Sequence, residues 1–262
     1  MKSVVCVKQV PATTSVSIDP ETKRLVRDGV ASVFNPFDYA ALEQAILIRE
    51  ALGGTVTVIT MGPPKAEQVL REAIAIGADA AVLLSDRRFG GSDTWATSYV
   101  LAQAIRKIGD VDCIYCGKQA IDGDTAQVGS GIAAHLGIAQ ASGVAGMEAP
   151  SGGGVIIRRL ADDGVDVCRV TLPGVFSVVK ELNEPRVPRL AGWLRAEKAI
   201  ISTWDADALA CEAHLLGLKG SPTRVVKTGA PAPRHATTHI IRSEPAAAAR
   251  ELIQRLRRIS AL

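Results

Sequence analysis

The segment TVTVITMGPPKAEQVLREAIAIGADAAVLLSD, residues 55–86, contains two apolar runs separated by an amphipathic run. Residues 55–61 are rich in β-branched side chains and predict a strand. Residues 64–77 carry apolar side chains at helical spacing and end at a glycine, which predicts a helix. Residues 80–86 form a second apolar run and predict a second strand. A strand, a helix and a strand in this order predict two parallel strands joined by a crossover helix, the repeating unit of an α/β fold.

The same alternation extends to both sides. Residues 35–54, NPFDYAALEQAILIREALGG, predict a helix with Asn35 as a candidate cap, Pro36 suited to the first turn and Gly53 as the stop. Further strands are predicted at 3–10 and 113–117, and further helices at 92–109, capped near Ser92 or Asp93, and at 126–136. Strands that alternate with helices of this length predict a three-layer αβα fold with a mostly parallel, doubly wound sheet.

The pattern changes after about residue 144. Residues 154–179 contain short alternating runs separated by turn signals, which predicts antiparallel strands added to the sheet. Residues 205–243 show no strong periodicity, and an amphipathic helix follows with Ser243 as a candidate cap and Pro245 in its first turn. An aperiodic stretch of that length is uncommon inside a compact domain. We therefore expect an α/β domain over 1–204 and an extended C-terminal arm over 205–262 that packs on a partner chain.

Composition narrows the class of protein. The chain has 262 residues, 47% of them hydrophobic, and no apolar run approaches the roughly 20 residues that span a bilayer. The apolar stretch between Lys2 and Lys8 is too short for a signal peptide, so we expect a cytoplasmic protein without a membrane span. The polar residues 17–29 predict a loop or small hairpin.

The five cysteines are odd in number and scattered, which fits a reducing compartment. Cys113 and Cys116 have the C-x-x-C spacing of redox and metal sites. They lie in a predicted buried strand, where residues three apart point to opposite faces. This favours packing over a redox or metal role, and the four histidines show no ligand spacing with the cysteines.

Charge is uneven along the chain. The net charge is +3, but residues 213–262 hold nine Lys and Arg against two Glu, a local charge of +7. Such a tail can contact nucleic acid. This one has no aromatic residues to stack on bases and no nucleic-acid motif, so we expect an arm that binds an acidic protein surface rather than nucleic acid.

Ligands of doubly wound sheets bind beyond the carboxyl ends of the strands. The predicted strand ends place Cys6–Lys8, Met61–Pro63, Ser85–Arg87 and Gly117–Gln119 at one edge. The segment GKQAIDGDTAQVGSGIAAHLG, residues 117–137, begins there and leads into a predicted helix. We expect the ligand site at this edge.

Residues 117–137 combine features that suit different parts of one ligand. A glycine-rich turn before a helix offers backbone N–H groups and the positive end of the helix dipole to a phosphate. Gly129 and Gly131 would let the backbone come close, and Thr125 and Gln127 add donors. Carboxylates such as Asp122 repel phosphate but accept from ribose hydroxyls or adenine. These features favour an adenine nucleotide or dinucleotide; the alternative is an ordinary Asp-Gly turn without a ligand.

The chain also contains six stretches in this order: VVCVKQVP, RDGVASVFNPFDYAALEQA, VTVITMGPP, REAIAIGADAAVLLSDR, CGKQAIDGDTAQVG and LNEPRVPRL. They span most of residues 1–200 and resemble the β subunit of electron transfer flavoprotein. The resemblance implies a heterodimer with a larger α subunit that carries an electron-transferring FAD. It also implies an adenine nucleotide in this chain, which is a structural AMP in one branch of the family. In the branch that bifurcates electrons it is a second FAD, reduced by NADH.

The resemblance places the nucleotide pocket at the sheet edge already identified. The implied cofactor-binding residues are Cys6, Val7, Lys8, Asn35, Pro36, Phe37, Asp38, Met61, Gly62, Gly117, Lys118, Gln119, Ala120, Ile121, Asp122, Gly123, Asp124, Thr125, Ala126, Gln127 and Val128.

Three stretches are similar to the bifurcating branch: MGPP, SDRRFGGSDTWATS and DGDTAQVG. Arg87 and Arg88, with Gly90 and Gly91, precede a predicted helix and offer a second anion site, suited to an NADH phosphate; the alternative is a solvated loop pair. The expected function is therefore NADH oxidation by a bound FAD, with electrons passed to the α-subunit flavin and a low-potential acceptor, linked to acyl-CoA dehydrogenases. The alternative is an AMP-binding structural subunit that docks dehydrogenases, and a stand-alone nucleotide-binding regulator is a third, weaker candidate.

Residues 183–195, NEPRVPRLAGWLR, are similar to the loop by which the family docks on partner dehydrogenases. Leu190 occupies the position of the apolar anchor. The similarity weakens after it, and Trp193 is either a second anchor or a residue that packs on the α subunit.

Overall fold

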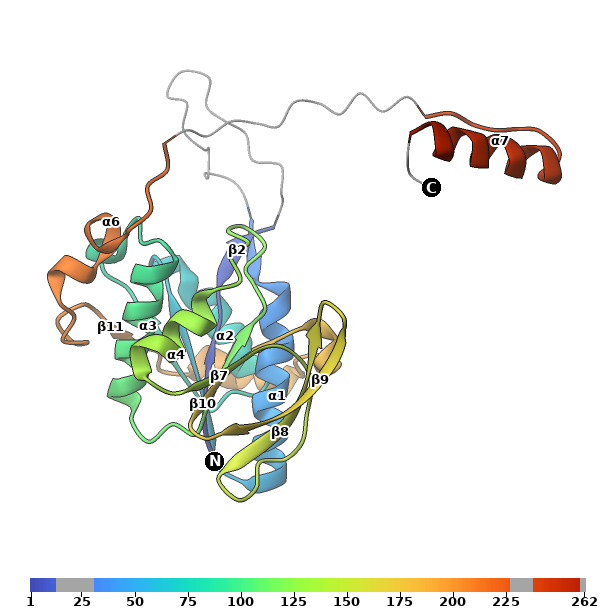
Figure 1. The fold of residues 1–262 in the computed structure, drawn as a ribbon. Helices are drawn as coiled ribbons and strands as arrows, with labels where there is room; N and C mark the ends of the chain where they lie inside the picture. The colour runs from blue at the N-terminus through green and yellow to red at the C-terminus, as the bar shows by residue number, and fades with distance from the viewer. Residues whose placement is uncertain (13–30, 227–237, 260–262) are drawn as a thin grey trace. The chain divides into compact units, whose positions relative to one another are not determined.

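The structure, a computed structural model, describes residues 1–12, 31–226 and 238–259 (Figure 1). Its contacts divide the chain into two units, Met1–Arg224 and Val225–Leu262. The loop or hairpin predicted for residues 17–29 lies outside the described residues. In the part of the chain that is described, no helix has the length and apolar character needed to cross a membrane.

A nine-stranded sheet forms the centre of the first unit, in the order β11-β5-β4-β1-β6-β10-β7-β8-β9. The strands from β11 to β7 are parallel, and β8 and β9 are antiparallel. The bounds are β1 Lys2–Cys6, β4 Thr55–Met61, β5 Ala80–Leu84, β6 Cys113–Gly117, β7 Ala139–Met147, β8 Gly154–Ala161, β9 Gly164–Thr171, β10 Gly174–Val178 and β11 Ser202–Trp204. The short strands β2 Gln9–Pro11 and β3 Ser32–Phe34 pair separately.

Helices cover both faces of this sheet (Figure 1). Their bounds are α1 Pro36–Leu52, α2 Glu67–Ile76, α3 Thr94–Ile108, α4 Val128–Leu136, α5 Leu190–Lys198 and α6 Gly217–Gly220; the second unit contains α7 Pro245–Arg258. Alternate residues of β1 serve the two faces, because Val5 packs with α1 and α2 while Val4 packs with α3 and α4. The predicted three-layer αβα fold with a mostly parallel sheet is confirmed.

Strand β10 differs from the prediction of antiparallel strands over residues 154–179, and β7 was not predicted. β10 lies between β6 and β7 and is parallel to both, whereas β8 is antiparallel to β7 and β9 is antiparallel to β8. All five side chains of β10 are buried, as expected for a strand covered on both faces. Strand direction depends on where the chain re-enters the sheet, and the local pattern of residues 174–178 carries no such information.

The predicted orientation of the C-x-x-C cysteines is confirmed. Cys113 packs on the side of α1 and α2, and Cys116 packs on the side of α3 and α4. Both are free thiols on β6. Among the described residues, no group of three or more Cys, His, Asp or Glu side chains is arranged to hold a metal ion.

Residues 205–224 belong to the first unit, which therefore ends at Arg224 rather than at residue 204. Ala206, Leu209 and Leu216 are buried in the same apolar cluster as α3 and α4. Between residues 205 and 224 the only α-helix is the four-residue α6, so no long periodic run marks this segment in the sequence.

The helix of the second unit begins one residue later than its predicted cap suggests. Glu244 occupies the cap position of α7, Pro245 follows in the first turn as predicted, and the cap makes no side-chain hydrogen bond. The prediction that Ser243 caps this helix is therefore wrong.

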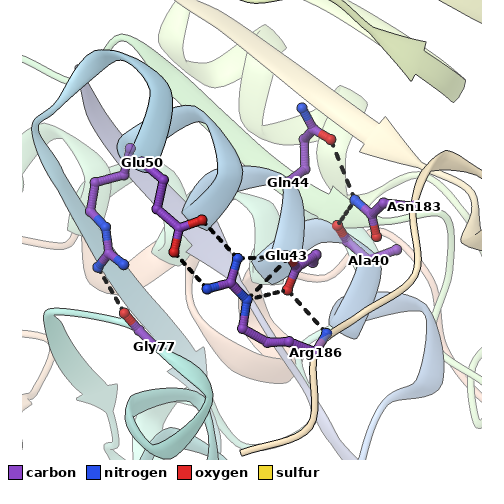
Figure 2. A network of polar contacts seen from close by, with 8 residues as sticks. Ala40, Glu43, Gln44, Glu50, Gly77, Asn183 and Arg186 are labelled. Atoms are coloured by element: carbon purple, nitrogen blue, oxygen red, sulfur yellow. Dashed lines mark hydrogen bonds and ion pairs between the residues drawn. The ribbon is translucent and has the colours of Figure 1, made fainter.

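One polar network fixes the segment after β10 on helix α1 (Figure 2). The guanidinium of Arg186 donates to both oxygens of Glu43, at 2.9 Å each, and to both oxygens of Glu50, at 2.6 and 2.9 Å. The backbone N–H of Arg186 donates to Glu43 as well, at 3.1 Å. Asn183 adds bonds to the carbonyl of Ala40 and to Gln44. Glu43 is buried and Glu50 is exposed. Loss of Arg186 would therefore leave the carboxylate of Glu43 as an uncompensated buried charge.

We expect Arg186→Ala to lower the free energy of unfolding of the first unit by about 2–3 kcal/mol, because it strands the Glu43 carboxylate in the core. Glu50→Gln removes only an exposed partner and should cost under about 1 kcal/mol. Chemical denaturation of the two variants measures the difference. Equal losses would show that the buried pair contributes no more than the surface one.

Candidate functional site

A cavity of about 450 Å³ lies beyond the carboxyl ends of β1 and β6. These strands are neighbours in the sheet, and the chain leaves them in opposite directions, to β4 and β5 on one side and to β10 and β7 on the other. This is the switch point at which doubly wound sheets bind their ligands. The volume lies in the range of small-molecule sites.

Most of the residues implied as cofactor-binding line this cavity. They are Cys6, Val7, Lys8, Asn35, Asp38, Met61, Gly117, Lys118, Gln119, Ala120, Gly123, Asp124, Thr125, Ala126, Gln127 and Val128. Pro36, Phe37, Gly62, Ile121 and Asp122 lie outside the lining, and so do Arg87, Arg88, Gly90 and Gly91.

The cavity has further walls that the sequence reasoning missed. Helix α3 contributes Asp93, Thr94 and Thr97, β6 contributes Cys116, and Thr223 lines the rim from beyond α6. The rule that groups the strand ends at one edge also places the starts of the following helices there, so the beginning of α3 could have been found. Thr223 lies more than ninety residues after the other lining segments, and no local signal marks it.

The loop before α4 presents unbonded backbone donors to the cavity. Within the described residues, no protein group accepts from the backbone N–H groups of residues 125–130. Helix α4 has neither a side-chain cap nor an acidic residue in its first turn, in contrast to α3, whose N–H groups are capped by Asp93. Uncapped donors at the positive end of a helix form an anion site.

Two residues of this loop adopt a strained backbone. Asp124 and Ala126 both have φ of 55°, in the left-handed region that costs a non-glycine residue roughly 1–2 kcal/mol. Strain of this kind persists where the surrounding structure enforces it, often at ligand sites. Alternating left-handed residues also change the direction of successive N–H groups, which is how backbone anion concavities are built.

Gly129 and Gly131, in the first turn of α4, have a packing role. A Cβ on Gly129 would lie 2.7 Å from Oγ of Ser177, and one on Gly131 would lie 2.3 Å from Oγ of Ser98. Both glycines therefore let α4 pack closely on β10 and α3. Gly129 also lines the cavity, and Gly131 does not. Gly123 differs, because a Cβ there meets no protein atom within 4 Å.

Asn35 occupies the cap position of α1, as predicted, and its side chain joins the helix to the loop. Its Nδ2 donates to Asp38 at 2.8 Å and to the carbonyl of Gln119 at 2.9 Å, and its Oδ1 accepts from Ile121 N–H at 3.3 Å. The predicted cap position is therefore confirmed, but the side chain makes no cap bond to α1. The residue holds the base of the cavity together.

Asp38 is a buried carboxyl in the cavity wall, only 4% exposed. Loss of solvation raises its pKa to about 7, against the lowering effect of bonds from Asn35 and from the backbone N–H groups of Lys8 and Gly117. Its charge therefore changes near neutral pH.

Asp122 and Asp124, whose carboxylates could repel a phosphate, have hydrogen-bond partners in the protein. Asp122 accepts from Nζ of Lys8 at 2.7 and 2.8 Å, and Asp124 accepts from Gln119. The opposing walls also meet where Thr94 of α3 donates to Thr125 of the loop at 3.2 Å. A phosphate at the start of α4 would therefore meet donors rather than a free carboxylate from Asp122.

The two candidate NADH arginines have different surroundings. Arg88 is held by Asp86 at 2.7 Å and by Asp207 at 2.8 Å, and it uses Nε and both terminal nitrogens in these contacts. Arg87 takes part in no ion pair among the described residues. Of the two, Arg87 has donors available for an anion.

The residues expected to dock a partner lie on helix α5. Leu190 is 76% exposed and Trp193 is 46% exposed in this chain. The opposite side of α5 packs tightly on α2, where a Cβ on Gly192 would lie 2.1 Å from the carbonyl oxygen of Ala75. The apolar side chains therefore point away from the sheet on a helix that is fixed to it.

The fold and the cavity define a doubly wound α/β protein whose ligand pocket lies at the switch point of the sheet. Residues 22–209 match the model of the electron transfer flavoprotein domain. The chain belongs to the electron transfer flavoprotein family, as a β subunit that pairs with an α subunit and serves electron transfer.

Three relatives illustrate the similarity. The electron transfer flavoprotein subunit beta of Thermoanaerobacterium thermosaccharolyticum is 50% identical, over 88% of each chain. Caffeyl-CoA reductase-Etf complex subunit CarD of Acetobacterium woodii is 45% identical, again over 88% of each. Protein FixA of Azorhizobium caulinodans is 46% identical, over 89% of this chain and 86% of the relative.

The raised pKa of Asp38 predicts a pH dependence of stability. Because the folded state binds this proton more tightly than the unfolded state, the contribution is complete below the ordinary pKa of 3.8 and is lost as pH rises through about 7. We expect the free energy of unfolding of the wild type to fall between about pH 4 and about pH 7.5, and that of Asp38→Asn to fall less over the same range. Asp122→Asn, at the exposed Lys8 pair, should keep the wild-type slope. Parallel slopes for wild type and Asp38→Asn would contradict the assignment.

Proposed function

We propose that this β subunit binds FAD in the cavity at the switch point and that NADH is the electron donor. FAD, when bound, would supply the two-electron chemistry through which electrons enter and then pass to the α-subunit flavin and a low-potential acceptor. The observation that carries the proposal is the row of unbonded N–H groups at residues 125–130, at the uncapped start of α4. These groups suit the pyrophosphate of a dinucleotide.

The other lining residues suit the rest of such a ligand. Thr125 and Gln127 offer side-chain donors beside the N–H groups, and Asp38 can bind through its carboxyl group in either protonation state. Lys8, paired with Asp122, closes one side of the site with a contact that a ligand can exchange for its own. The chain thus binds, orients and partly desolvates the nucleotide.

FAD is favoured over AMP by the similarity of MGPP, SDRRFGGSDTWATS and DGDTAQVG to the bifurcating branch. AMP remains the second candidate, because the cavity of about 450 Å³ also suits a mononucleotide in a purely structural role. In that case the chain docks dehydrogenases without reacting with NADH. The name of the CarD relative joins an Etf subunit to a caffeyl-CoA reductase, which supports an acyl-CoA oxidoreductase as partner.

The protein contacts follow from the exposed surfaces. We place the partner dehydrogenase on α5 through Leu190 and Trp193, which are exposed on a helix fixed to α2. We place the basic arm that ends in α7 on the α subunit, because Leu252, Ile253 and Ile259 are exposed in the chain by itself.

Gly123→Val tests the pocket. A Cβ there meets no protein atom within 4 Å, so we expect the added side chain to interfere with a ligand rather than with the fold. We expect at least a tenfold loss of bound nucleotide with an unchanged melting temperature. Ala149→Val, an exposed position outside the cavity, adds similar volume and should leave occupancy unchanged. Full occupancy in Gly123→Val would show that the loop is not the cradle.

The flavin content of the purified heterodimer tests the cofactor. Two flavins per heterodimer, reduced by NADH in a stopped-flow experiment, are expected. One flavin with one AMP, and no reduction by NADH, would replace the proposal with the AMP-binding alternative.

Arg87→Ala tests the NADH contact. Loss of one charge-assisted contact should weaken NADH binding about ten- to a hundredfold, measured as the NADH concentration that half-saturates the reduction rate. Arg88→Ala is the matched control, because its guanidinium already binds Asp86 and Asp207, and it should affect stability more than NADH binding. Equal NADH affinity in wild type and Arg87→Ala would move the NADH site elsewhere while keeping the cofactor.

A further inference from the structure

Asp93 uses its two carboxylate oxygens for two different purposes. Oδ1 accepts from the backbone N–H groups of Trp95 and Ala96, at 3.0 and 3.1 Å, and so caps helix α3. Oδ2 accepts from the backbone N–H and the hydroxyl of Thr223, at 3.0 and 2.8 Å. Burial raises the pKa of this carboxyl, but the bonds from Ala96, Thr223 and Trp95 outweigh it and hold the pKa below its usual range. The carboxylate therefore stays charged and keeps both sets of bonds at neutral pH.

The backbone of Asp93 is bound to the same segment. Its N–H donates to Oγ of the buried Ser221 at 2.9 Å, and Ser221 donates to the carbonyl of Gly217 at 2.7 Å. Leu218 of the same segment fills the space that a Cβ on Gly91 would need. Residues 217–223 are thus attached to the start of α3 immediately before the second unit begins at Val225.

These contacts reach the ligand cavity. Asp93, Thr94 and Thr223 all line it. Thr94 bonds to Thr125, which belongs to the loop with the unbonded N–H groups. One continuous path of bonds and shared cavity wall therefore joins the nucleotide loop to the root of the C-terminal arm.

We propose that Asp93 and Thr223 form a latch that links nucleotide binding to association with the α subunit. Asp93 is a positioning residue, which holds the start of α3 against the ligand and the root of the arm beside it. A nucleotide that fills the cavity orders Thr223, and an arm whose root is ordered loses less freedom when the α subunit binds it. The proposal rests on nucleotide binding in this cavity.

Linkage of this kind is reciprocal, so each ligand must strengthen the other by the same factor. The latch should be sensitive to small changes, because the hydroxyl of Thr223 is one of only two donors to Oδ2 among the described residues. Thr223→Val removes this donor with little change of volume. Thr223→Ser keeps it.

The test measures the dissociation constant of full-length β subunit for the α subunit, with and without saturating AMP, and again with FAD. The ratio of the two constants is the coupling factor, and a general loss of folded protein cancels from it. We expect a factor of at least fivefold in the wild type and in Thr223→Ser. In Thr223→Val and in Asp93→Asn, whose amide can still cap α3, the factor should fall below about twofold. Thr203→Val on the exposed edge of β11 is the control for an unrelated threonine and should keep the wild-type factor.

The outcomes separate the two proposals. A wild type that binds AMP or FAD but shows a coupling factor of one overturns the latch and leaves the proposed pocket intact. The same holds if Thr223→Val keeps the wild-type factor. A wild type that binds neither nucleotide overturns the pocket and the latch together.

Discussion

The side chain of Asn35 is the contact on which the ligand site depends. It is buried where the chain enters α1, and its three hydrogen bonds connect Asp38, Gln119 and Ile121. These residues come from the segments that follow β3 and β6, which are far apart in the sequence and meet at the switch point. Without this amide, the base of the 117–128 loop would lose its attachment to α1, and Asp38 would lose the donor that offsets its burial. The position of the loop, and through it the unbonded donors before α4, follows from this contact.

The order of strands and helices from residue 35 to residue 136 could be read from the sequence, because each element there is local. Periodicity, β-branched runs and terminal signals such as Pro36, Gly53 and Asp93 specify an element without reference to the rest of the chain. The later part could not be read in the same way. β10 inserts between β6 and β7, and residues 205–224 complete an apolar cluster on α3. Both placements depend on surfaces that form only when the sheet exists. The rule that ligands bind beyond the carboxyl ends of the strands located the cavity, but it did not identify all of the lining residues.

The site shows the same division between local and long-range information. The glycine pattern of residues 117–137 correctly indicated a loop before a helix, but the glycines fit Ser98 and Ser177, residues that the pattern cannot see. The adjacent residues Arg87 and Arg88 look equivalent in the sequence. Asp207, far along the chain, forms an ion pair with Arg88 and not with Arg87. Thr223, far along the chain, lines the cavity and is bound there by Asp93. Local chemistry thus predicts which kinds of residues form the site, and tertiary contacts decide which of them are available.

The left-handed conformation of Asp124 and Ala126 has a consequence for how fast and how selectively the loop can bind. A loop that is already bent does not have to search for its bound shape, so encounter with a phosphate can lead directly to capture. The bend also sets the directions of the donors, so a ligand with a differently spaced anion gains less from them. The fold carries the conformational cost at all times, whether or not a ligand is present. Selectivity at this edge of the sheet is therefore a property of the backbone, and exchange of individual side chains around it would alter affinity more readily than choice of ligand.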